Sequence, residues 1–114
     1  MIGGIMTVTE LLDKLPLRAL CLPDPDRDVT GGYTGDLLSW VMGSAQPGQA
    51  WVTIMSNVNV VAVATLCDVS CVILAQGVTL EPEVLKTAES KLVNVLTSPL
   101  PAFELCLTVG ELIR

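Results

Sequence analysis

The sequence contains no histidine. This removes the commonest general base, the serine and cysteine nucleophiles that depend on histidine, and most zinc–water sites. The sequence also lacks a G-x-x-x-x-G-K-[ST] phosphate loop and a G-x-G-x-x-G dinucleotide motif. We therefore expect a protein that has no catalytic residues of its own and binds no cofactor.

Charge is scarce as well, since Asp, Glu, Lys and Arg make up only 16% of the 114 residues. The net charge is −6, and the six basic residues are scattered along the chain. Nucleic acids and anionic membrane surfaces are bound by clustered Lys and Arg. We expect neither of them as a partner.

Aromatic residues account for 4% of the chain, although 51% of its residues are hydrophobic, so the apolar content is mainly aliphatic. Such a composition excludes disorder. A small, charge-poor domain leaves apolar surface exposed unless another subunit covers it, which predicts a homodimer. Trp40 and Trp51 are expected to be core or interface anchors.

No export signal or membrane span is expected. Residues 1–6 carry no positive charge, and Glu10 follows closely. The longest apolar stretch, residues 58–74, is interrupted by Asn59, Asp68 and Ser70, and it is shorter than the roughly 20 residues that a membrane helix needs. We expect a soluble, cytoplasmic protein.

The four cysteines do not form the tight C-x-x-C pairs of a metal site; they are Cys21, Cys67, Cys71 and Cys106. Without an export signal they are expected to be reduced thiols. Most lie in apolar runs, where cysteine acts as a small hydrophobic residue. We expect no metal site.

Helix and strand patterns alternate along the chain. Thr7 and Glu10 form a capping-box pattern that starts a helix ending at Pro16, and Pro82 marks the first turn of another. Further helical segments are expected at residues 34–42, 65–70 and 101–113. Strands are expected at residues 18–22, 50–55, 59–64, 71–75 and 94–97, with residues 56–57 linking two of them.

Strands that are apolar on both faces and alternate with helices are typical of a parallel or mixed sheet covered by helices. The sequence contains no linker, internal repeat or low-complexity tract. We predict the α/β class: one three-layer domain over residues 1–114, with a mixed, mostly parallel sheet flanked by helices.

A polar segment, residues 24–36, separates a predicted strand from a predicted helix, which is where open α/β sheets bind ligands. Its two glycines allow positive φ, and a helix beginning near Thr34 would direct its positive end at an anion. The candidate ligand-binding residues are Asp28, Thr30, Gly31, Gly32, Tyr33 and Thr34. The same residues also fit a simple helix-capping turn, and both interpretations stay open.

Residues 28–39, D-V-T-G-G-Y-T-G-D-L-L-S, resemble the signature of the DRTGG domain family. Further similar blocks follow in order, at Gly43 and at residues 48–54, 59–64, 72–77 and 98–105. The resemblance therefore covers nearly the whole chain, and the ordered blocks are more specific than the pentapeptide alone.

The resemblance implies a fold similar to the N-terminal domain of HPr kinase/phosphorylase and to the uridine-nucleotide-binding N-terminal domain of Mur ligases. Family members occur beside CBS pairs, in phosphotransacetylases and as small stand-alone proteins, which implies a regulatory or oligomerisation role. One position departs from the motif, because Val29 replaces its arginine. Any anion contact of that arginine is therefore in question, and Arg27 is a candidate replacement.

Three hypotheses follow. The first is a stand-alone regulatory or small-ligand-sensing domain that dimerises and binds an anionic or nucleotide-like ligand at residues 28–33. The second is a pure interaction module that docks to a metabolic or signalling complex. The third is a small hydrolase or transferase that uses Asp26, Asp28 and Thr30. A pocket at the two glycines favours the first, a flat exposed patch the second, and a perturbed carboxylate the third.

Overall fold

The computed structural model describes residues 5–113, so the part of the export-signal expectation that rests on residues 1–4 lies outside it. Five strands form one sheet: β2 (Arg18–Cys21), β4 (Gly31–Thr34), β5 (Gln49–Thr53), β6 (Cys71–Leu74) and β7 (Val95–Thr97). Their spatial order is β2-β7-β6-β5-β4. Strands β4 to β7 are parallel, and β2 is antiparallel to β7.

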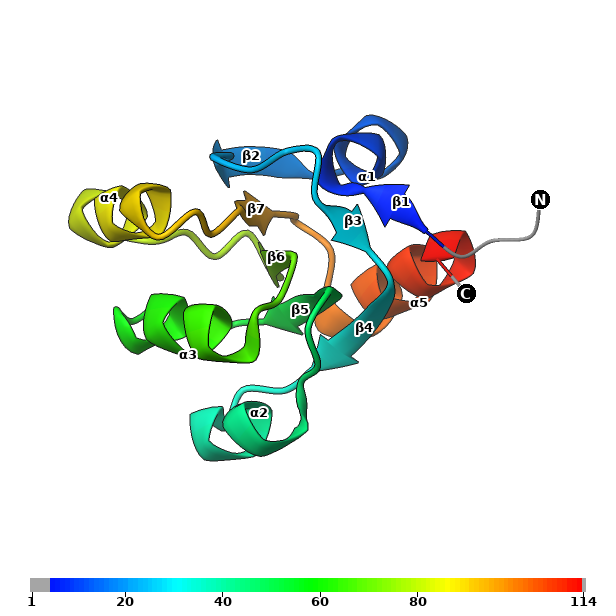
Figure 1. The fold of residues 1–114 in the computed structure, drawn as a ribbon. Helices are drawn as coiled ribbons and strands as arrows, with labels where there is room; N and C mark the ends of the chain where they lie inside the picture. The colour runs from blue at the N-terminus through cyan, green and yellow to red at the C-terminus, as the bar shows by residue number, and fades with distance from the viewer. Residues whose placement is uncertain (1–4, 114) are drawn as a thin grey trace.

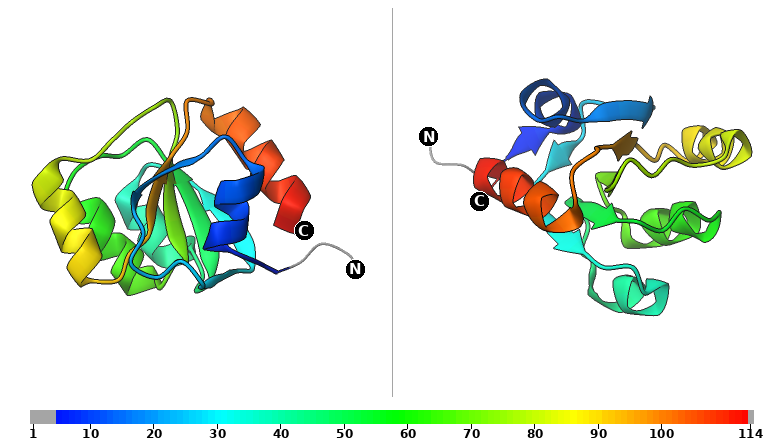
Figure 2. Two further views of the ribbon diagram at one scale, coloured as in Figure 1. Left: turned by 90° about the horizontal axis from the view of Figure 1, so that it is seen from above. Right: turned by 180° about the vertical axis from the view of Figure 1, so that it is seen from behind.

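Helices cover both faces of this sheet (Figures 1 and 2). One face carries α2 (Leu38–Ser44), α3 (Asn59–Cys67) and α4 (Pro82–Ser90), and the other carries α1 (Val8–Lys14) and α5 (Ala102–Ile113). Consecutive parallel strands joined by right-handed crossovers place their connecting helices on one face. The predicted fold class, a three-layer α/β domain with a mostly parallel sheet, is confirmed.

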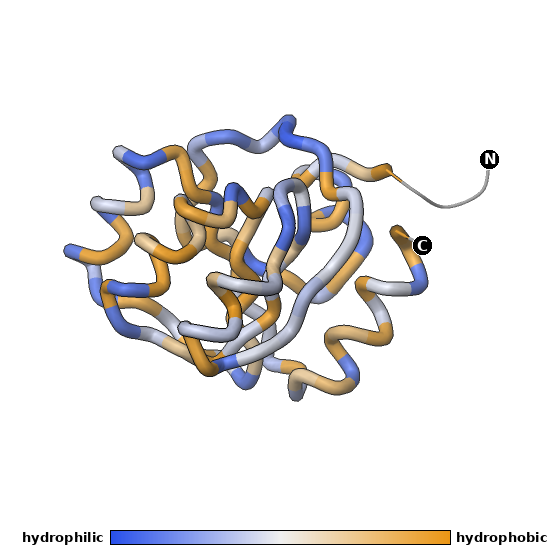
Figure 3. The backbone as a smooth tube through the Cα atoms, turned by 60° about the horizontal axis from the view of Figure 1, so that its bottom comes forward, coloured by the Kyte–Doolittle hydropathy of each residue, from blue (hydrophilic) through white to orange (hydrophobic). Residues whose placement is uncertain are grey.

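The core consists of two layers because the central strands are buried on both faces. Along β5, Trp51 packs against the α2–α4 layer, while Ala50 and Val52 pack against α1 and α5. β6 alternates in the same way, and all four of its residues are buried. Figure 3 colours the backbone by residue hydropathy, and hydrophobic residues recur along the strands and the helices.

A short antiparallel ribbon of β1 (Met6–Thr7) and β3 (Asp28–Val29) lies beside α1. The predicted capping box is confirmed: the Glu10 N–H donates to Thr7 Oγ1 at 3.2 Å, and the Thr7 N–H donates to Glu10 Oε1 at 2.9 Å. No helix within residues 5–113 is long and apolar enough to span a membrane.

The prediction of a strand at residues 59–64 is wrong, since these residues belong to α3. Valine-rich segments favour strands. However, β5 and β6 are adjacent and parallel, and a hairpin cannot join parallel neighbours, so the connection crosses over, most commonly through a helix, and here through α3. Asn57, predicted to lie in a link between strands, accepts the Asn59 N–H at 2.9 Å at the start of that helix.

The start of the predicted helix at residues 34–42 is also wrong. Residues Gly31–Thr34 form β4 and pair with β5, and α2 begins only at Leu38. Other predicted elements are confirmed within a few residues of their expected bounds, namely the helices at α1, α4 and α5 and the strands β2, β5, β6 and β7.

Asn94 joins three segments through its buried side chain. Its Nδ2 donates to the carbonyls of Asp24 at 2.7 Å and Ser70 at 2.9 Å, and its Oδ1 accepts the Asp24 N–H at 2.9 Å.

We expect Asn94→Ala to lower the free energy of unfolding by about 2–4 kcal/mol, because the buried polar groups of Asp24 and Ser70 lose their hydrogen bonds. Urea unfolding measures this loss. Asn57→Ala, which removes one exposed hydrogen bond, should cost only about 1 kcal/mol. Equal losses would contradict the role given to Asn94.

Candidate functional site

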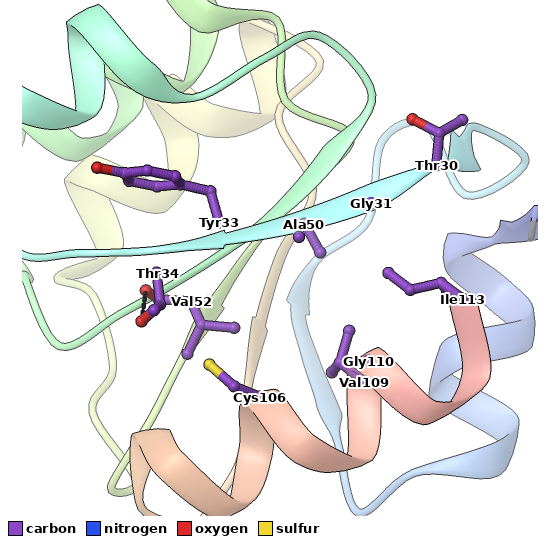
Figure 4. Close-up of a pocket in the computed structure, with 11 residues that line it drawn as sticks. Thr30, Gly31, Tyr33, Thr34, Ala50, Val52, Cys106, Val109, Gly110 and Ile113 are labelled. Carbon is purple, nitrogen blue, oxygen red and sulfur yellow. Dashed lines mark hydrogen bonds between the residues drawn. The ribbon is translucent and has the colours of Figure 1, made fainter.

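A pocket of about 340 Å³ opens between the edge strand β4, its neighbour β5 and helix α5 (Figure 4). β4 contributes Gly31, Gly32, Tyr33 and Thr34, with Thr30 just before it. The remaining lining residues are Ala50, Val52, Cys106, Val109, Gly110 and Ile113. Five of the six predicted ligand-binding residues therefore lie together at one pocket.

The space exists because small residues face one another across it. Gly32 on β4, Ala50 on β5 and Gly110 on α5 leave a gap that larger side chains would fill. Gly31 lines the gap through its backbone, because a side chain there would point to the other face of β4, toward Gln49. A Cβ on Gly110 would meet no atom within 4 Å, and a Cβ on Gly31 or Gly32 would make only ordinary contacts, the nearest at 3.7 Å. Packing within the chain thus does not require glycine at these three positions.

The expectation of positive φ at the glycine pair is wrong. In the described residues, positive φ among glycines occurs at Gly48 (+84°) and Gly77 (+71°), and not at Gly31 or Gly32. Gly48 is the glycine that local geometry demands, since a Cβ there would also lie 2.7 Å from Thr30 Oγ1. It holds the start of β4 by accepting the Thr30 N–H at 2.9 Å.

The lining is uncharged, and its polar groups are hydroxyls and backbone. Thr34 Oγ1 donates to the carbonyl of Val52 at 3.1 Å, which is the dashed contact in Figure 4. The Tyr33 side chain points to the opposite side of β4 from Cys106, Val109 and Ile113, so its backbone lines the pocket while its ring packs against the α2–α4 layer. The positive helix end expected near Thr34 is absent from the described site, because α2 begins at Leu38.

Asp28 is the predicted site residue that does not line the pocket. It is exposed on β3, where its backbone carbonyl accepts a hydrogen bond from Ser70 Oγ. Asp26 is exposed in the preceding turn and also lies outside the lining. The proposed trio of Asp26, Asp28 and Thr30 therefore contributes only Thr30 to the pocket.

Val29, at the position of the motif arginine, is fully buried and packs with Val8, Leu11 and Leu105 in the core layer beneath α1 and α5. Arg27 does not replace that arginine in the pocket. Its Nη2 lies 2.8 Å from Asp68 Oδ1 and donates to the Asp68 carbonyl at 2.7 Å. Arg27 thus holds the C-terminal cap of α3, where Asp68 has a left-handed backbone.

Three of the four free thiols are buried, at Cys21, Cys67 and Cys71, and Cys106 is partly exposed at the pocket. Burial raises the pKa of Cys71 to about 12. Burial, together with the hydrogen bond to Glu89 and its negative charge, raises the pKa of Cys21 to about 12. Among residues 5–113 no three Cys, Asp or Glu side chains converge as metal ligands would.

Sequence patterns did not indicate the α5 side of the pocket. One clue was present, because Gly110 lies within a helix, where glycine is unfavourable unless packing or function requires it. The contribution of Cys106, Val109 and Ile113 follows only from the position of α5 against β4 and β5.

Neither protein-family models nor curated proteins match this chain. Its fold does match the crystal structure of the CBS and DRTGG domains of the regulatory region of a Clostridium perfringens pyrophosphatase, complexed with its activator diadenosine tetraphosphate. The TM-score is 0.74 at 16% sequence identity, over 95% of this chain and 47% of that chain. This chain has a DRTGG-like fold. It spans about half the length of the region solved from the pyrophosphatase.

The glycines at the site should respond differently to alanine substitution. Gly48→Ala is expected to lower the free energy of unfolding by about 1–3 kcal/mol, because its φ is positive and its Cβ would clash with Thr30. Gly31→Ala, Gly32→Ala and Gly110→Ala should leave it unchanged or raise it by up to about 1 kcal/mol. Denaturant unfolding distinguishes the two groups, and a large loss at Gly32 would show that the chain itself needs that glycine.

Thiol labelling should distinguish the cysteines. We expect Cys106 to react with a thiol reagent at pH 8 in the folded protein, while Cys21, Cys67 and Cys71 react only after unfolding, because they are buried. The pKa values of Cys21 and Cys71 are raised in the folded state, so these two thiols ionise more readily in the unfolded chain. The free energy of unfolding should therefore keep their full contribution below about pH 9 and fall as the pH rises from there toward 12. Mass spectrometry of labelled peptides measures the first effect and unfolding at several pH values the second.

Proposed function

We propose that this chain is a regulatory domain without catalytic activity that senses a small, nucleotide-like ligand in the pocket between β4 and α5. The observation that carries the proposal is the pocket itself, which gathers Thr30, Gly31, Gly32, Tyr33 and Thr34 from the motif segment. Its volume of about 340 Å³ lies within the range typical of small-molecule sites, about 300–1,000 Å³.

The lining indicates which part of a ligand enters. Aliphatic side chains and glycine backbone suit a flat apolar group such as a base, and the lining offers no cationic side chain for a phosphate. Arg27, the nearby basic residue of the motif segment, is paired with Asp68. The proposed ligand therefore buries its base in the pocket and leaves its phosphates in solvent.

The glycines of the pocket provide a second argument that it binds a ligand. Gly31, Gly32 and Gly110 line the pocket, yet neither backbone angle nor internal packing demands glycine at any of them. At Gly32 and Gly110, close approach of a ligand to the backbone is a physical reason for glycine. An occupant contacting β4 and α5 together would also stiffen the contact between them, which is a route from binding to regulation.

The structural neighbour supports the same class of function. The matched region of the pyrophosphatase is regulatory, and it was solved with diadenosine tetraphosphate, an activator made of two adenosines joined by phosphates. From this neighbour we take only the class of ligand, a nucleotide-like molecule, for the proposal.

A second candidate function, a pure interaction module, is favoured by exposed apolar side chains. Trp40, expected as an anchor, is 70% exposed, whereas Trp51 is fully buried in the core. Phe103 on α5 is 75% exposed. These side chains suit protein contacts, and such contacts are compatible with ligand sensing in the pocket.

The test is a thermal-shift and calorimetric titration with adenosine, AMP and diadenosine tetraphosphate. A ligand at a hundred times its dissociation constant should stabilise the protein by about 2.7 kcal/mol. Because the pocket is uncharged, we expect the affinities for adenosine and AMP to agree within about tenfold and to change little with salt.

Gly110→Leu should abolish this stabilisation by filling the pocket, while Glu111→Leu, the same side chain placed on the exposed face of α5, should retain it. If none of the three compounds stabilises the wild-type protein, the nucleotide-like class is wrong. If one stabilises Gly110→Leu as strongly as the wild type, the pocket is not the site.

A further inference from the structure

Helix α3 carries no charged residue on any side, although only one side faces the core. Its sequence, N-V-V-A-V-A-T-L-C, contains no charged residue. Val60, Val61, Val63 and Ala64 are buried, but Ala62 and Leu66 are exposed. The other exposed residues of α3 are Asn59 and Thr65, which are polar but uncharged. A surface helix normally carries charged residues on its outer face, so an outer face with Ala62 and Leu66 and no charge suits contact with another surface.

The surroundings of α3 extend this uncharged surface. Between Asp36 and Asp68 the chain contains no Asp, Glu, Lys or Arg, and this segment includes all of α2 and α3. α2 packs directly against α3. Large apolar side chains exposed on this segment are Leu37, Trp40, Met42, Ile54, Val58 and Leu66.

The exposed side of α3 has the shape for packing against another helix. Val58, Ala62 and Leu66 follow one another at intervals of four residues, so they form a single ridge along the helix surface. Beside the ridge lies a groove of about 270 Å³ between α3 and α4, rimmed by Thr87 and Lys91. A ridge next to a groove is self-complementary, because the same two features can interlock when two copies meet.

Charge decides which partner suits this face. The chain carries a net charge of −6, so two copies repel one another wherever acidic residues meet. On α5 the exposed Phe103 and Leu107 are flanked by Glu104 and Glu111, and self-pairing there would bring carboxylates together. Helices α2 and α3 carry neither acidic nor basic residues, and the charged residue that lines the adjoining groove is Lys91, the C-cap of α4. Self-pairing along α3 therefore brings no carboxylates of these helices together.

We propose that the α3 ridge is the interface of a two-fold homodimer, in which the ridge Val58–Ala62–Leu66 of one copy packs across the same ridge of a second copy. The interface lies on the face of the sheet opposite α5, so dimerisation leaves the β4–α5 pocket open. The inference is independent of the proposed ligand.

The experiment measures mass in solution by light scattering and sedimentation equilibrium, without ligand. We expect a dimer for the wild type. Ala62→Glu and Leu66→Glu should each raise the dissociation constant by at least about 100-fold, because every dimer would bury two introduced carboxylates. Phe103→Glu adds the same charge to the opposite face and should remain a dimer. Far-UV circular dichroism confirms that each variant is folded.

Cross-linking gives a second measurement that needs no disruptive charge. With Ala62 near the two-fold axis, Ala62→Cys should form a covalent dimer under mild oxidation, while the wild type, with its four native cysteines, should not. A wild type that stays monomeric up to about 1 mM, the range of weak association, overturns the proposal. So does a dimer that resists both glutamate variants, a dimer that Phe103→Glu dissociates, or a failure of Ala62→Cys to cross-link.

Discussion

Burial of the parallel strands on both faces is the constraint on which the rest of the structure depends. Trp51 packs to one side of β5, and Ala50 and Val52 pack to the other, so the sheet must be covered twice. Three consecutive crossovers supply one cover, and α1 with α5 supplies the other. This requirement turns a valine-rich segment into α3, because parallel neighbours cannot be joined by a hairpin.

The pocket forms where the two-sided covering ends. β4 is the edge strand, and α5 reaches it with Gly110 opposite Gly32, so the layers approach without filling the space between them. The proposed dimer interface lies on the other face, along α3. Ligand and second copy would therefore act on opposite sides of one rigid sheet, and α5 and β4 are the elements that an occupant of the pocket contacts directly.

Some residues of the motif segment stabilise the fold, and others line the pocket. Val29, at the position of the motif arginine, is a core residue, and Arg27 secures the cap of α3 through Asp68. The motif positions that remain at the pocket offer hydroxyls and backbone rather than charge. The lining of the pocket is thus apolar and uncharged, whereas the motif suggested a site for an anion.

Local patterns in the sequence determined much of this protein. The capping box at Thr7, the proline that starts α4 and the two-sided apolar strands indicated most elements and the fold class, because these features depend on neighbouring residues. They also indicated most of the β4 side of the pocket. Only the tertiary structure decided that residues 59–67 form a helix, that the two glycines lie in an edge strand, and that α5 completes the pocket. These features depend on which strands become neighbours and where a distant helix lies, and no local pattern encodes contacts between segments so far apart in the chain.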